Sequence, residues 1–166
     1  VEQMGDGTKW RLSAVIGGSP GATDPDPATV QPVYINEVLA HTDPPLFDSI
    51  ELVNGGVLAQ NIGGWWLSDD YRVPKKYRIP ADMNLGAGEF KVFDESQFRV
   101  VGAADTSFSL SAFGDEAHLF SANAAGELTG WHAGASFGAS YNGVSFGRYL
   151  TSDGRALMVA QSQVSL

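Results

Sequence analysis

Short apolar runs alternate with turn-forming clusters along most of the chain. Within several runs, hydrophobic and polar residues alternate with a period of two, as in EFKVF (89–93) and SFSLSAF (107–113). This period is typical of strands that bury one face, and no long window shows a helical period. Regular spacing of such strands predicts an all-β sandwich or barrel. The predicted strands are residues 33–40, 49–53, 64–70, 76–80, 89–93, 107–113, 116–122, 144–150 and 156–161.

The alternation also predicts which side chains form the core. On GWWLSD (64–69), Trp65 and Leu67 share one face of a strand and Trp66 takes the other. Ile50 and Leu52 are expected to face the same core, which leaves Glu51 pointing outward. The further core candidates are Phe90, Val92, Phe108, Leu110, Leu119 and Phe146.

The chain before residue 33 has a different character. Residues 1–22 hold one apolar cluster, and residues 23–32, TDPDPATVQP, are typical of a stiff, extended linker. We therefore expect an N-terminal arm and Pro-rich linker over residues 1–32, followed by a sandwich over residues 33–166. Two interpretations of residues 1–22 stay open. They are the end of a preceding module, or an arm that pairs along an open sheet edge.

Composition narrows the classes of partner. The net charge is −9, from 19 acidic and 10 basic residues, and such a balance disfavours nucleic acid, which is bound through basic contacts to phosphate. There is no apolar run long enough to span a bilayer, so membrane insertion is not expected. The start, VEQMGDGTKW, lacks the features of a signal peptide and indicates a piece of a longer chain. Without cysteine, disulfides give no clue to the compartment.

Five motifs follow one another in a recognisable order. They are INEV (35–38), DSIELVN (48–54), GWWLSDD (64–70), YRIPADMNLGAGEF (77–90) and FSLSAFGDEAHLF (108–120). In this order the chain resembles the bacterial lamin-tail domain family over about residues 33–150. The resemblance implies an immunoglobulin-like β-sandwich of the lamin-tail type, here with an extra N-terminal arm. It also implies a module of a larger protein, because such modules accompany extracellular enzymes and adhesion domains in bacteria.

Two short motifs, GASFG (134–138) and GVSFG (143–147), match the pattern around a hydrolase nucleophile. That chemistry needs a strand-to-helix turn after the serine and a histidine further along the chain. No helical pattern and no histidine follow Ser136 or Ser145. Glu37 and Glu51 are the strand carboxylates to consider for glycoside hydrolysis, but nothing in the sequence places them in a cleft. We therefore expect no catalytic residue and no enzyme.

Carboxylates in loops give one candidate metal site. Asp43, Asp48, Asp69 and Asp70 would supply oxygen ligands for calcium if their two loops converged at one end of the sandwich. The alternative, which we favour, is that these aspartates form turns and keep the module soluble. The three histidines have no zinc-binding spacing. No cofactor is therefore expected, and calcium is the one candidate ion.

Aromatic side chains give the candidate ligand-binding residues. Trp66 is expected to point away from the core, with Tyr71 and Tyr77 close by in sequence, and exposed aromatic rings stack on sugars or anchor protein interfaces. The alternative is that the loop of residues 69–76 or the N-terminal arm covers Trp66. The basic residues of that region are expected to pair with Asp69 and Asp70.

These observations predict a non-catalytic binding, adhesion or spacer module of a larger secreted or cell-surface bacterial protein. The expected partners are a protein or glycan at a cell surface and the neighbouring domains of the same chain. The alternative is a calcium- or carbohydrate-binding module attached to an extracellular enzyme.

Overall fold

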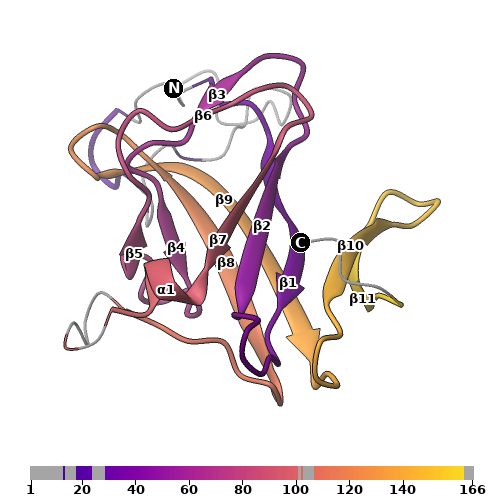
Figure 1. Ribbon diagram of the computed structural model, residues 1–166. Helices are drawn as coiled ribbons and strands as arrows, with labels where there is room; N and C mark the ends of the chain where they lie inside the picture. Colours follow the sequence, from indigo (N-terminus) through magenta and orange to yellow (C-terminus); the bar gives the residue numbers. More distant parts are fainter. Residues whose placement is uncertain (1–12, 14–17, 24–28, 101, 103–106, 163–166) are drawn as a thin grey trace.

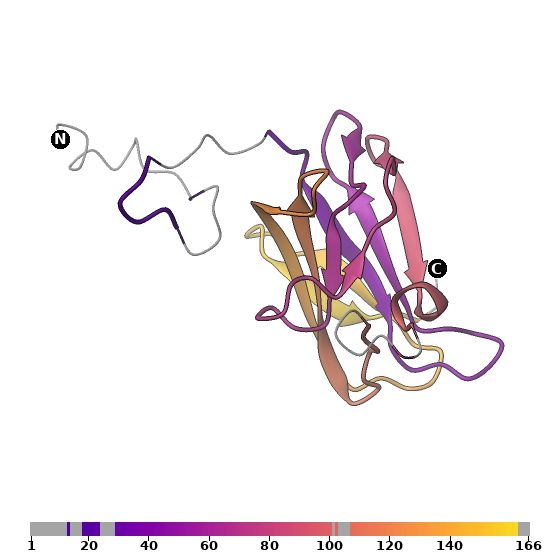
Figure 2. The ribbon, with the colours of Figure 1, turned by 90° about the vertical axis from the view of Figure 1, so that its left-hand side faces the viewer.

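The structure, a computed structural model, describes residues 13, 18–23, 29–100, 102 and 107–162. Within these residues the regular elements are β-strands and one helical turn, α1 (Glu95–Phe98). Most of these strands form two sheets that pack face to face, as Figures 1 and 2 show from two sides. The predicted all-β sandwich is therefore confirmed.

Both sheets are built from antiparallel neighbours. The larger sheet has the order β11 (Ala156–Ala160), β10 (Phe146–Leu150), β1 (Val33–Leu39), β2 (Ser49–Asn54) and β7 (Phe90–Asp94). The four-stranded sheet has the order β5 (Tyr77–Arg78), β4 (Trp66–Ser68), β8 (Gly114–Ala122) and β9 (Leu128–Gly138). A small ribbon pairs β3 (Gln60–Asn61) with β6 (Asn84–Leu85). Strands β9 and β11 are each the last strand of their sheet.

The hydrophobic core lies between the two sheets, as the alternation of side chains predicts. Trp65 is 2% exposed and Leu67 is fully buried, so the assignment of faces on this strand is confirmed. Phe146 is half-buried and packs against the core. The other predicted core residues that the structure confirms are Ile50, Leu52, Phe108, Leu110 and Leu119.

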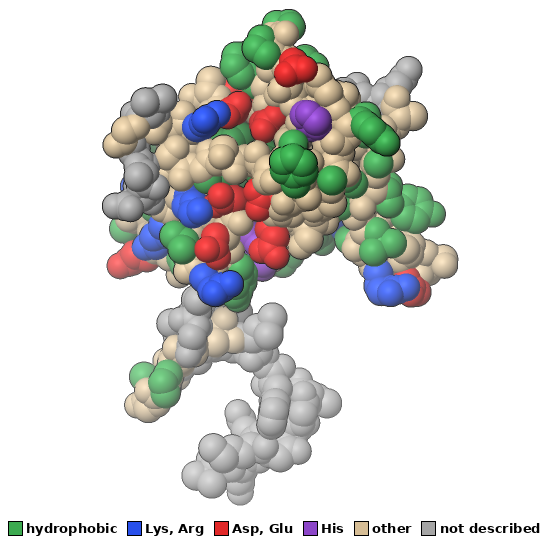
Figure 3. Space-filling view, turned by 90° about the horizontal axis from the view of Figure 1, so that it is seen from below, with side chains coloured by type: hydrophobic (Ala, Val, Ile, Leu, Met, Phe, Trp, Pro, Cys, Tyr) green, Lys and Arg blue, Asp and Glu red, His purple; other side chains and the backbone are tan. Residues whose placement is uncertain are grey.

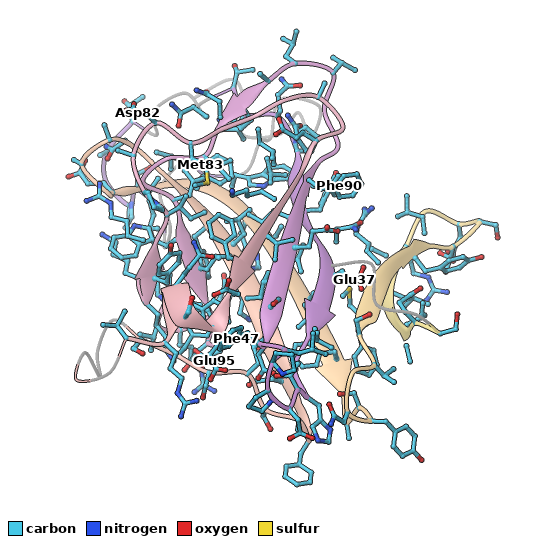
Figure 4. The ribbon with its side chains drawn as sticks, viewed as in Figure 1. Glu37, Phe47, Asp82, Met83, Phe90 and Glu95 are labelled. Carbon is cyan, nitrogen blue, oxygen red and sulfur yellow. The ribbon has the colours of Figure 1, made fainter. Side chains whose placement is uncertain are left out.

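The prediction for β7 was wrong, because its two faces are exchanged. Phe93 is fully buried, whereas Phe90 is 53% exposed and Val92 is half-buried on the outer face. Figure 4 shows Phe90 on the right-hand side of the view, away from β4 and β5. The reason is the register with β2, which places Phe93 beside the core residue Ile50.

The side chain of Glu51 points away from the core, as the alternation with Ile50 and Leu52 predicts, but it is not exposed to solvent. Glu51 is only 7% exposed, and its Cα partner across the β1–β2 ladder is Glu37, which is 3% exposed. The ladder is irregular between Ile35 and Glu37, and Asn36 at this point donates a hydrogen bond of 2.7 Å to the Glu51 carboxylate. Burial raises the pKa of Glu51, and the neighbouring Glu37 raises it further.

Two segments differ from the predicted strands. Residues 107–110 form no strand, although Phe108 is buried and stacks on Phe98 at a centroid distance of 4.5 Å. The segment lies against α1 instead, where the Phe108 amide donates a hydrogen bond to the Phe98 carbonyl. Conversely, β9 was missed because its glycines read as turn residues. Gly134 and Gly138 are both in strand conformation, paired with β8.

Three loops meet at the lower end of the sandwich in Figure 1, which we call the loop end. Hydrogen bonds tie them together. His41 Nδ1 bonds to the Ser140 carbonyl, the Gly143 amide donates to the His41 carbonyl, and the Ser140 amide donates to the Ala112 carbonyl. Figure 3 looks onto this end and shows hydrophobic side chains beside acidic and basic ones. The exposed hydrophobic residues of these loops are Leu46, Phe47, Phe113 and Tyr141.

The first strand, β1, begins at Val33. Just before it, Gln31 packs onto the sandwich, where its side-chain oxygen accepts hydrogen bonds from the Val57 and Leu58 amides. Most of residues 1–22 lie outside the described residues, so both interpretations of this segment stay open. In the described part of the chain, no helix is long and apolar enough to cross a membrane.

Candidate functional site

Large side chains gather on the outer face of the four-stranded sheet. Alternation along β8 sends Ala117 and Leu119 into the core and His118 and Phe120 to the opposite face. The hairpin register places His132 of β9 beside Phe120. The pairing of β8 with β9 therefore makes these outward-facing residues neighbours.

A chain of hydrogen bonds runs through the two imidazoles. His118 Nε2 lies 2.8 Å from the Glu116 carboxylate, and His118 Nδ1 lies 3.0 Å from His132 Nε2. An ionised carboxylate only accepts, so a neutral His118 donates from Nε2 and accepts at Nδ1. It follows that His132 donates from Nε2 and keeps a free acceptor at Nδ1. With His118 neutral, these hydrogen bonds fix the tautomer of each ring.

Tyr71, in the loop after β4, covers this pair from the solvent side. Its ring centroid lies 5.1 Å from that of His132, 5.9 Å from that of His118 and 5.9 Å from that of Phe120. The contacts with both histidines are edge-on, a favourable arrangement for aromatic rings. Tyr71 nevertheless remains 56% exposed, so it presents an aromatic ring to solvent on a rigid base. We call Tyr71, His118, Phe120 and His132 the histidine face.

Trp66 borders the histidine face, because it pairs with Phe120 across the β4–β8 ladder. Its Nε1 donates to the Gly126 carbonyl at 3.1 Å. Lys75 and Arg78 place cations over its ring, at 5.9 and 5.7 Å from the centroid. Trp66 is therefore half-buried and held in place, and Tyr71 offers the more accessible ring.

Tyr77 lies on the other side of the sheet. It pairs with the core residue Leu67 and packs edge-on against Phe93, with ring centroids 6.1 Å apart. Burial, and to a smaller extent Asp94, raise the pKa of Tyr77. Of the three predicted ligand-binding aromatics, the structure brings Trp66 and Tyr71 together and separates Tyr77 from them.

The four predicted calcium ligands each have protein partners. Asp69 forms an ion pair with Lys76, and Asp70 accepts a hydrogen bond from the Arg72 amide. Asp48 accepts from the Thr42 hydroxyl, and burial raises its pKa. Asp43 accepts from the side chain of Asn142. Across the described residues, no group of three or more His, Cys, Asp or Glu is placed to hold a metal ion.

The two serines of the nucleophile-like motifs occupy different environments. Ser136 is exposed on β9, in a strand rather than at a strand-to-helix turn. Ser145 is fully buried before β10, and its hydroxyl makes no hydrogen bond to any described residue. No imidazole is in hydrogen-bond contact with either hydroxyl in the described structure.

Sequence reasoning missed the histidine face. No strand was predicted between residues 122 and 144, so His132 was not expected to lie beside His118. The signal that was present is the strand pattern HLF (118–120), in which His118 and Phe120 share a face. The pairing partner could not be identified, because the Gly-rich segment of β9 does not show the alternation of large apolar residues that marks a strand.

Acidification is expected to destabilise the protein through His132. Burial, and also the neighbouring His118, lower its pKa below the ordinary value of 6.5. As the pH falls, the unfolded chain takes up this proton first, so the contribution is present above about pH 6.5 and is lost below it. Thermal unfolding from about pH 7.5 to 5 should show a falling midpoint, and the fall should be smaller in His132→Gln. Equal slopes for the parent and this variant would contradict the assignment.

Comparisons with known proteins address the fold family. The family model described as Lamin Tail Domain matches residues 26–137, which is more than half of the chain. The matched segment includes all four residues of the histidine face, the whole of β8, and β9 except its last residue. No curated protein and no solved structure matches the chain.

Proposed function

Because this chain belongs to the lamin tail domain family, whose members are immunoglobulin-like modules without enzymatic activity, we propose that it is an interaction module of a larger secreted or cell-surface bacterial protein. Its task is to attach or position the rest of that protein by binding a protein or glycan at a cell surface. The extracellular location is supported by the acidic, Pro-rich linker and by the resemblance to modules that accompany extracellular enzymes and adhesion domains.

One observation carries the proposal. Tyr71 is half-exposed and rests on three other rings, two of which are linked to each other and to Glu116 by hydrogen bonds. A ring that is already immobilised loses little conformational entropy when it binds. Aromatic residues with a rigid support are also frequent among the residues that dominate binding energy at interfaces. The histidine face is therefore the surface that we assign to the partner.

A non-catalytic role agrees with the environment of the candidate nucleophiles. Ser145 is buried in the sandwich, and Ser136 lies in a regular strand. Nucleophilic catalysis needs a hydroxyl that a base activates and that a substrate reaches. The buried pair Glu37 and Glu51 lies in the β1–β2 ladder, where Asn36 already binds one carboxylate.

Substituting Tyr71 should abolish most of the binding. We expect the labelled protein to bind a member of a glycan panel or intact bacterial cells, and Tyr71→Ala to weaken this binding about tenfold or more, as for other central aromatic residues. Tyr141→Ala is the matched control, because Tyr141 is 86% exposed at the loop end. It should bind as the parent does.

The result is read from the pair of variants. Loss in Tyr71→Ala with retention in Tyr141→Ala supports the histidine face as the binding surface. Equal losses, or no binding of the parent to cells and glycans, would contradict the proposal. A parent that binds glycans would favour the carbohydrate-binding alternative over a protein partner.

A further inference from the structure

Strand β9 is an edge strand without the usual protection. It is the last strand of its sheet, and its sequence LTGWHAGASFG contains no Lys, Arg, Asp, Glu or Pro. Edge strands expose unpaired backbone groups, and natural proteins commonly block them with charges or proline. Of the exposed residues along β9, Gly130, Gly134, Ser136 and Gly138 are small, and His132 is the one large residue. An incoming backbone would therefore meet little steric resistance.

A groove of about 470 Å³ runs beside this edge. On one side it is lined by residues 132–136 of β9, and on the other by residues 156–158 of β11. Both strands are the outermost ones of their sheets, so the groove lies between two open edges. Figure 1 shows the β10–β11 hairpin at the right of the molecule. The groove shares His132 with the histidine face, whereas Tyr71, His118 and Phe120 do not line it.

Arg148 contributes a positive charge to the groove. Its guanidinium lies 4.2 Å from the centroid of the Tyr34 ring. The Tyr34 ring in turn meets Trp131 edge-on at 6.1 Å, and Trp131 Nε1 donates to the Val33 carbonyl at 3.2 Å. This stack positions the cation before any ligand arrives.

The Arg148 side chain has no acidic partner in the described part of the chain. Elsewhere in the structure, Arg99 pairs with Glu95, and Arg155 pairs with Asp153 at 2.9 Å. No hydrogen bond or ion pair connects the Arg148 side chain to any described residue. Arg78 also has no ion pair among the described residues, but its guanidinium donates to the Ala124 carbonyl at 2.8 Å. The Arg148 guanidinium is therefore held on an aromatic ring and remains available to an acidic ligand.

We propose that the groove binds an extended peptide segment that carries an acidic side chain. The peptide backbone pairs with the open edge of β9, and the carboxylate binds the guanidinium of Arg148. Addition of a strand to a sheet edge supplies affinity through main-chain hydrogen bonds, and a pocket beside the edge supplies selectivity for side chains. Charge complementarity selects an acidic segment, because arginine forms two parallel hydrogen bonds with a carboxylate. This second site goes beyond the function proposed for the histidine face and does not depend on it.

Fluorescein-labelled peptides test the proposal on the full chain. The probe is a short peptide of alternating threonine and valine with one central glutamate. One control peptide has lysine in place of glutamate, and a second has prolines that remove main-chain donors. We expect fluorescence polarisation to show saturable binding of the glutamate peptide and at least about tenfold weaker binding of both controls, a change of about 1.4 kcal/mol.

The matched protein variants are Arg148→Ala and Arg155→Ala. Arg155 lies in the turn before β11, and its side chain is 74% exposed. Arg148→Ala should weaken binding of the glutamate peptide at least about tenfold, whereas Arg155→Ala should not change it. Circular dichroism of each variant checks that the sandwich is folded. Tyr71→Ala should bind the peptide as the parent does. A failure of peptide binding is therefore distinguishable from a failure of the partner binding that we propose for the histidine face.

Several results would overturn the proposal. These are no binding of the glutamate peptide, equal affinity for the glutamate and lysine peptides, or full binding by Arg148→Ala. A labelled peptide with the sequence of residues 8–17 addresses a different occupant. If it binds more tightly than the glutamate peptide, the groove belongs to the N-terminal segment of this chain, and the acidic partner is excluded.

Discussion

Replacing Phe93 with alanine is expected to lower the free energy of unfolding by about 3–5 kcal/mol, the usual cost of removing a buried aromatic ring. Phe93 is fully buried between the sheets and contacts the ring of Tyr77. The alanine variant loses the transfer energy of the ring and leaves a cavity that the sandwich cannot close. Urea denaturation followed by tryptophan fluorescence measures the difference.

Phe90→Ala is the matched control, because it removes the same side chain from the same strand. Phe90 is 53% exposed on the outer face, so its loss should cost no more than about 1 kcal/mol. Equal costs at the two positions would contradict the register of β7 against β2. If Phe93→Ala does not fold, Phe93→Leu keeps most of the apolar contact and should still be less stable than Phe90→Leu.

Replacing Gly134 with alanine should give the second large effect. A Cβ atom at Gly134 would lie 2.7 Å from His118 Nδ1, closer than real Cβ atoms come to a neighbour, and 3.1 Å from His132 Cε1, which is also a tight contact. One or both imidazoles must move, and their mutual hydrogen bond is lost. We expect a destabilisation of about 1–3 kcal/mol, as for other overpacked sites. The support under Tyr71 is lost at the same time, so partner binding should weaken together with stability.

Gly138→Ala controls for the general effect of replacing a glycine in β9. Nothing lies within 4 Å of a Cβ atom at Gly138, and its backbone needs no left-handed conformation. Alanine there should be neutral or slightly stabilising, because it restricts the unfolded chain. Thermal unfolding of both variants tests this. If Gly134→Ala were as stable as Gly138→Ala, the close packing of the two histidines against β9 would be incorrect.

The fold class and much of the core followed from the sequence alone. Side chains in a strand alternate between two faces, so Trp65 and Leu67 had to share one face whatever the rest of the chain did. Where only one face of a strand is strongly apolar, as at Ile50 and Leu52, the inward face follows directly. The order of the five motifs then indicated the family, which the family model confirmed.

Alternation does not decide which face is inward when both are apolar. In β7, Phe90 and Val92 lie on one face and Phe93 on the other, and only pairing with β2 selects Phe93 for the core. The same limit applied to Glu51. Its outward direction was predictable, but its burial depends on Asn36 and on Glu37 of the adjacent strand.

The candidate sites were decided almost entirely by tertiary structure. His118 and His132 meet because the β8–β9 hairpin places Gly134 opposite His118, and a larger residue there would exclude the contact. The groove at Arg148 exists because β9 and β11 end different sheets and lie next to each other. The sequence by itself determined the fold class, the relative faces of strands such as Trp66–Ser68 and Ser49–Asn54, and the family, because these depend on local periodicity and motif order. Register, burial of polar groups and contacts between distant segments were decided only by the tertiary structure, because they depend on which strands pair.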